Sequence, residues 1–189
     1  MKDEELVFHL YLTQILLLAI AFISGWILFG SIVDLFGLMD WTDMLVWKAG
    51  AVAGLVVVAA DLLLMKLLPA KYYDDGGLNE RIFANQSIGK IALICLVVSF
   101  SEELLFRGVI QTNFGIVIAS LIFALVHYRY LSHWFLFLNV VTLSFVIGYI
   151  YMRTGNLAVT VAMHFIIDFL LGIAIRLRSK NKQAGMLHE

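Results

Sequence analysis

The sequence is poor in cysteine, proline and charge. One cysteine, Cys95, and one proline, Pro69, occur in 189 residues. A single cysteine excludes an internal disulfide framework and a zinc site built from cysteine pairs. Only 14% of the residues are charged, and 13 Lys and Arg against 14 Asp and Glu leave a net charge of −1. Nucleic-acid binding is not expected, because the chain has no basic stripe to contact phosphates.

Apolar residues are in excess. They make up 62% of the chain, and the mean hydropathy is +0.93. Soluble domains are about 45–50% apolar and about 25% charged. A chain this short cannot fold that much apolar surface inward, so lipid must surround it. We therefore predict an all-α, polytopic protein of the cell membrane, with about six transmembrane helices packed around an intramembrane polar cavity.

Six stretches are candidates for these helices, because a span needs about 20 mostly apolar residues. They cover residues 6–29, 46–68, 89–110, 114–128, 132–152 and 156–177. The fourth is short. With no internal repeat, residues 1–189 are predicted to form a single membrane domain. It comprises two N-terminal spans and a polar loop (1–87), a core (88–177) and a cytoplasmic tail (178–189).

The distribution of Lys and Arg predicts the orientation. With the N-terminus inside, the cytoplasmic segments hold most of the basic residues: Lys2, Lys66, Lys71, Arg81, Lys90, Arg129, Arg176, Arg178, Lys180 and Lys182. The positive-inside rule therefore places both termini in the cytoplasm.

Several polar residues fall inside predicted spans, where a charged side chain costs about 2.5–3.5 kcal/mol. The set comprises Glu102, Glu103, Arg107, His127, His164 and Asp168. Asp61 is a lone further case in the second span, and we interpret it as a helix-packing residue. Such residues must face one another or a wet cavity, which makes them functional candidates.

The spacing of these residues is helical. Three pairs lie four residues apart and so share one face of a helix: Glu103 with Arg107, Phe123 with His127, and His164 with Asp168. At 1.5 Å per residue, Glu102 and His127 lie about 14 and about 20 Å from the joint between their spans. His164 and Asp168 lie about 12 and about 18 Å from theirs, on the same side of the membrane. One mid-membrane layer therefore contains all four.

A carboxylate and two imidazoles in a shielded pocket suit the activation of water. A glutamate can act as a general base, and an imidazole can donate a hydrogen bond to a developing oxyanion. Peptide hydrolysis by activated water needs these groups and no covalent nucleophile. Ser99 and Ser101 have no base at a suitable spacing, which disfavours a serine mechanism.

Three motifs resemble those of the CPBP family of intramembrane proteases, which comprises CAAX proteases and bacteriocin-processing proteins and is also called Abi. The run from Glu102 to Arg107 resembles the EExxxR motif. Phe123 to His127 resembles FxxxH, and His164 to Asp168 resembles a His followed four residues later by Asn or Asp. The motifs occur in the family's order, on separate apolar segments, within residues 88–177.

The resemblance implies an endopeptidase with packed transmembrane helices around a conical cavity. Glu102 would activate water, His127 would help to hold it, and His164 with Asp168 would line the oxyanion hole. Glu103 and Arg107 would form a buried supporting pair, whereas Phe123 is expected to serve in packing. Many prenyl-protein proteases have Asn where this chain has Asp168. An ionised Asp168 would be a poor oxyanion donor, so it would have to be protonated, orient His164 or serve another role.

The cofactor and the substrate stay open at this point. The favoured mechanism needs no metal, but His127, His164 and Glu102 could also supply the ligands of a catalytic zinc ion. Expected partners are membrane lipid and a hydrophobic, lipidated or leader-peptide polypeptide. The alternatives from other classes are a small proton- or ion-coupled transporter and a non-catalytic immunity protein.

Overall fold

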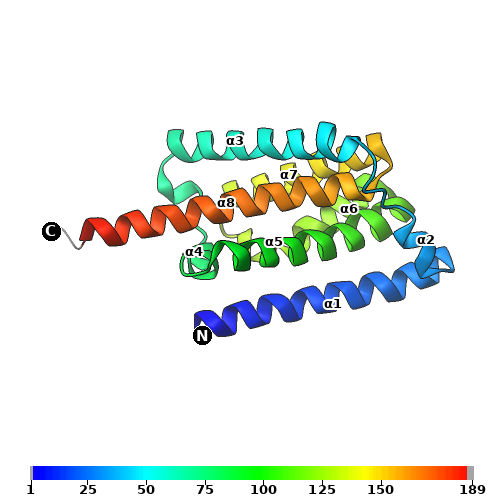
Figure 1. Ribbon diagram of the computed structural model, residues 1–189, viewed down its shortest axis with the longest axis horizontal. Coiled ribbons are helices and arrows are strands. Elements are labelled where there is room, and N and C mark those ends of the chain that lie inside the picture. The colour runs from blue at the N-terminus through cyan, green and yellow to red at the C-terminus, as the bar shows by residue number, and fades with distance from the viewer. Residues whose placement is uncertain (1, 187–189) are drawn as a thin grey trace.

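The computed structural model describes residues 2–186, and all regular elements among them are helices. The long helices are α1 (Asp3–Phe29), α3 (Val52–Leu67), α5 (Ile88–Glu103), α6 (Thr112–Val126), α7 (Trp134–Thr154) and α8 (Leu157–Met186). In Figure 1, α8 lies between α3 and α5, and α1 packs on the outer side of α5. The prediction of an all-α membrane protein is confirmed.

Short elements join the long helices. They are α2 (Ile32–Phe36), η2 (Ala70–Tyr72), α4 (Leu78–Phe83) and η4 (Tyr128–Tyr130), together with two π-helical segments, η1 (Val46–Ala51) and η3 (Leu104–Gln111). The polar stretch 70–88 accordingly contains η2 and α4. The sequence did not predict the π-helices, of which η3 directly follows Glu103.

Exposed apolar side chains cover the long helices. Ile27 is 70% exposed, Val56 63% and Leu125 62%. Five helical stretches are long and apolar enough to cross a membrane: Asp3–Phe29, Val46–Leu67, Ile88–Val126, Trp134–Thr154 and Leu157–Asn181. The outward faces of the bundle are therefore suited to acyl chains, and the polar groups lie inside.

The fourth predicted span, 114–128, corresponds to α6 and is short, as its sequence indicated. The chain turns back at Gly115, whose φ of 84° and ψ of 168° interrupt the helix. In a straight helix Arg107 and Phe123 would be about 24 Å apart, yet the guanidinium lies 4.9 Å from the ring centroid. The helical part after Gly115 is only about 16 Å long, about half the length of α7.

The other predicted spans lie, to within two residues, in α1, in η1 with α3, in α5 with η3, in α7 and in α8. The described part of the predicted tail, 178–189, continues α8 as far as Met186, and residues 187–189 lie outside the described residues.

Two contacts attach the N-terminal helices to the core. Gly50 and Gly54 let η1 and α3 approach α8 closely: a Cβ added at Gly50 would lie 2.4 Å from the Val159 carbonyl oxygen. On the other side, the buried Ser101 hydroxyl donates a 2.5 Å hydrogen bond to Gln14 Oε1 of α1. Ser101 immediately precedes Glu102, so α1 contacts the helix that bears the site.

The close approach at Gly50 generates a test. We expect Gly50→Ala to lower the free energy of unfolding by about 1–3 kcal/mol, because the added methyl group meets rigid backbone. Gly89→Ala is the matched control, since a Cβ at Gly89 meets nothing within 4 Å. Thermal unfolding in detergent micelles measures both. Equal stability of the two variants would contradict the packing role of Gly50.

Candidate active site

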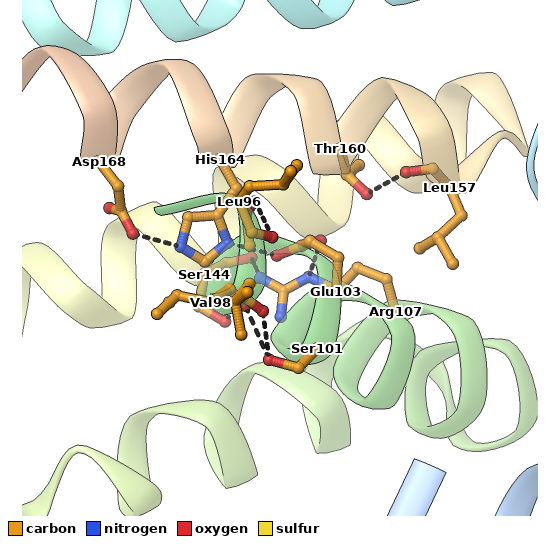
Figure 2. A network of polar contacts seen from close by, with 12 residues as sticks. Leu96, Val98, Ser101, Glu103, Arg107, Ser144, Leu157, Thr160, His164 and Asp168 are labelled. Carbon is orange, nitrogen blue, oxygen red and sulfur yellow. Dashed lines mark hydrogen bonds and ion pairs between the residues drawn. The ribbon is translucent and has the colours of Figure 1, made fainter. Parts of the chain in front are cut away.

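An ion-paired network crosses the centre of the bundle. Glu103 of α5 is fully buried and accepts a 2.9 Å hydrogen bond from His164 Nδ1 of α8. Its other carboxylate oxygen lies 3.5 Å from Arg107 Nε. His164 Nε2 lies 3.4 Å from Asp168 Oδ2, one turn further along α8. Figure 2 shows this chain of contacts between α5, η3 and α8.

The protonation of His164 follows from its two neighbours. An ionised carboxylate can accept a hydrogen bond but cannot donate one. An imidazole that contacts two ionised carboxylates therefore carries a proton on each ring nitrogen. With His164 as an imidazolium, positive and negative charges alternate along the series Arg107, Glu103, His164 and Asp168. Two positive and two negative charges then balance, which makes their burial in the bundle tolerable.

Arg107 is held on its other sides by α7 and α6. Its Nη2 donates to the backbone oxygen of Ser144 at 3.1 Å and to the Ser144 hydroxyl at 3.3 Å. Its guanidinium carbon lies 4.9 Å from the centroid of the Phe123 ring, a cation–π contact. The side chain has no exposed surface. Arg107 thus joins four elements: α5, η3, α6 and α7.

The Phe123 ring packs near aromatic side chains of all three motifs. Its ring centroid is 5.0 Å from that of Phe106, 4.6 Å from that of His127 and 6.5 Å from that of His164. The side chain is 3% exposed, so it packs inside the bundle next to the charged network. The expected packing role agrees with these contacts.

His127 is fixed in one tautomer when neutral. Its Nδ1 lies 2.8 Å from the Phe123 carbonyl oxygen, which can only accept, so Nδ1 carries the proton. The ring also stacks on Tyr130, at 6.3 Å between centroids and 7° between planes. Nε2 therefore presents a lone pair, and this half-buried nitrogen makes no hydrogen bond to the described residues.

Glu102 contrasts with its neighbour Glu103. It is 7% exposed and forms no hydrogen bond or ion pair with any residue of 2–186. Its carboxyl group is close enough to His127, His164 and Asp168 for their charges to act on it. The structure thus leaves one carboxylate engaged in ion pairs and the adjacent one free.

The structure brings Glu103, Arg107, His164 and Asp168 into contact, with Glu102, Phe123 and His127 beside them. Asp61 lies elsewhere and accepts a 3.4 Å hydrogen bond from Asn139 Nδ2. Sequence reasoning missed Ser144 and Tyr130. A serine inside a span carries no signal of its own, because small polar residues are common in helix packing.

The residues proposed as zinc ligands do not fit that role in the described geometry. No three His, Cys, Asp or Glu side chains among residues 2–186 are grouped so that they could hold a metal ion. Both ring nitrogens of His164 already face carboxylates. A metal would have to displace at least one of these contacts.

Residues 84–170 match the family model described as "Type II CAAX prenyl endopeptidase Rce1-like". The match begins just before α5 and ends within α8, and it includes every motif residue described above. This match and the relatives described next show that the chain belongs to the CPBP family of intramembrane endopeptidases of the CAAX type.

Two relatives extend the comparison. The uncharacterized protein YpbD of Bacillus subtilis (strain 168) is 44% identical over 165 residues, which cover 87% of each chain. The UPF0177 protein YxdF of Lactococcus lactis subsp. lactis (strain IL1403) is 32% identical over 101 residues. That alignment covers 48% of this chain and 55% of YxdF. No solved structure matches the chain.

The Glu103–Arg107 contact generates a second test. Arg107→Met leaves the buried carboxylate without its guanidinium, so we expect a loss of about 3–5 kcal/mol in the free energy of unfolding. Adding Glu103→Gln removes the unpaired charge and should recover part of that loss. Denaturant unfolding of both single variants and the double variant measures the coupling. Simple additivity of the single effects would contradict the ion pair.

Proposed function

We propose that this chain hydrolyses a peptide bond of a membrane-associated polypeptide with a water molecule activated by Glu102. The supporting observation is the free carboxylate of Glu102 beside His127, whose Nε2 is also free. Neither group has a partner among the described residues, so both are available to a water molecule without the loss of an existing contact. A general base in such a position contributes about 10²–10⁴-fold to a rate.

The reaction proceeds by addition and elimination. Water donates one hydrogen bond to Glu102 and the other to His127 Nε2, which leaves an oxygen lone pair for the carbonyl carbon. Glu102 takes a proton as the new C–O bond forms, and the carbonyl π electrons move to the oxygen. When the C–N bond breaks, Glu102 returns that proton to the leaving nitrogen.

His164 supplies the hydrogen bond to the oxyanion. Its Nε2–H faces Asp168 at 3.4 Å, a long contact, and the Asp168 side chain is 31% exposed. The substrate carbonyl displaces Asp168 from this nitrogen, and the developing oxyanion then accepts from the imidazolium. Asp168 therefore serves to orient His164 before substrate binds, and this role suits a carboxylate.

Glu103 and Arg107 support the site and do not contact the substrate. Both are fully buried, and Glu103 fixes His164 through Nδ1. A histidine held on one nitrogen presents the other in a defined direction. This arrangement makes Glu103 a positioning residue for the oxyanion donor.

The substrate class follows from the surroundings of the site and from the family. The candidate groups lie among apolar helices that face lipid, so a scissile bond reaches them from a membrane-bound chain. We propose a prenylated or otherwise hydrophobic polypeptide tail, or the leader of a secreted peptide. The protein would reside in the cell membrane with both termini in the cytoplasm, as the distribution of basic residues predicts.

A conservative substitution tests the role of Glu102. Glu102→Gln keeps the shape of the side chain but removes the base, so cleavage of a lipidated peptide in proteoliposomes should fall by at least about 10²-fold. Asp61→Asn is the matched control, because it neutralises a carboxylate in another helix and should retain activity. Full activity of Glu102→Gln would exclude the mechanism. Ion flux without cleavage would instead support the transporter alternative.

Chelation tests the proposed independence from metal. We expect purified protein treated with a strong zinc chelator to cleave the same peptide at an unchanged rate. Elemental analysis should show substoichiometric zinc before and after the treatment. Tightly held stoichiometric zinc whose removal abolishes turnover, and whose return restores it, would support the metalloprotease alternative.

A further inference from the structure

Helices α1 and α5 lie side by side and begin at the same end of the bundle (Figure 1). A groove lies between them at that end. Its volume is about 280 Å³. Glu4 and Tyr11 line it from α1, and Gln86 and Lys90 line it at the start of α5. It is separate from the Glu102 cluster, and the proposed function assigns it no role.

The polarity of the groove changes with depth. The charged residues belong to the first turns of the two helices, α1 from Asp3 and α5 from Ile88. Val7 and Leu93 lie about 4.5 Å further along their helices and are apolar. The groove is thus charged at the membrane edge and apolar further in. A phospholipid has the same order of polarity, with a charged headgroup followed by acyl chains.

The groove contains one negative and one positive side chain, and neither has a partner. Glu4 and Lys90 are both exposed, and the side chain of neither forms an ion pair or a hydrogen bond with any described residue. Neighbouring acids differ: Asp3 pairs with Arg81 at 2.8 Å, and Glu5 accepts from the Lys2 backbone N–H at 2.8 Å. A ligand with one negative and one positive group complements this pair.

The α5 side of the groove suits the negative group. Lys90 lies in the first turn of a 16-residue helix that Ser87 caps by accepting from the Lys90 backbone N–H at 3.3 Å. The positive end of the helix dipole and the lysine ammonium both favour a phosphate there, and the Gln86 amide can donate to it. The positive group of the ligand then faces Glu4.

We propose that this groove binds the headgroup of phosphatidylethanolamine, with the phosphate at Lys90 and the ammonium at Glu4. Phosphatidylglycerol has no cation for Glu4. The quaternary ammonium of phosphatidylcholine has no N–H to donate to a carboxylate. The bound lipid contacts both α1 and α5, and α5 is the helix that bears Glu102.

Lipid titration tests the site on the full-length protein. Delipidated protein in detergent is titrated with dioctanoyl phosphatidylethanolamine, phosphatidylcholine or phosphatidylglycerol, and native mass spectrometry and the thermal midpoint report binding. We expect the ethanolamine lipid to bind at least about tenfold more tightly than the other two. Glu4→Gln should remove that preference, because Glu4 faces the ammonium. Lys90→Gln should weaken the binding of all three lipids, because each of them carries the phosphate. Both side chains lack partners, so neither substitution disturbs packing.

Lys66→Gln is the matched control: this exposed lysine in the last turn of α3 lies outside the groove and should keep the preference. Equal binding of the three lipids by the unmodified protein would overturn the proposal. A preference that survives in Glu4→Gln, or unchanged binding of all three lipids by Lys90→Gln, would also overturn it. Free phosphoethanolamine binding as tightly as the lipid would overturn the phospholipid as the occupant.

Discussion

A carboxylate without exposed surface, in a bundle surrounded by lipid, requires cations around it. Glu103 is that group here, and it contacts Arg107 and His164 directly. Each of these cations depends on further partners, since Ser144 and Phe123 hold Arg107 while Asp168 faces His164. The same contacts therefore hold η3, α6, α7 and α8 around α5. Folding and the assembly of the site are in this sense one process.

The sequence predicted the membrane class and most helix positions because apolar length is a local property. It also predicted that costly polar residues must meet, and the structure brings Glu103, His164 and Asp168 into contact. The reversal at Gly115 lies next to the joint that the sequence placed between residues 110 and 114, and the short fourth span corresponds to α6. The π-helix after Glu103 was not predictable in the same way, because nothing in the composition of residues 89–110 marks it. Its Arg107 contacts Phe123 and Ser144, which belong to distant segments.

Two adjacent glutamates have different environments because they lie about 100° apart around one helix. Glu103 faces the cations, while Glu102 is left without a partner. The sequence alone predicted a Glu103–Arg107 pair, but the contact of Glu103 with His164 required coordinates.

The N-terminal helix also belongs to this arrangement, although the family match begins only at residue 84. Through Gln14, α1 contacts Ser101, the residue next to Glu102.

The short α6 has a consequence for the segment that follows it. Its helix ends at Val126, and η4 leads the chain on to His133, just before α7. Within this stretch the backbone N–H groups of Tyr130, Leu131 and His133 donate to the carbonyl oxygens of His127, Tyr128 and Tyr130. Peptide groups at membrane depth must be satisfied by the chain itself or by surrounding protein or water. The connection therefore needs no solvent for these donors, and it can pass through a nonaqueous environment as a compact bridge.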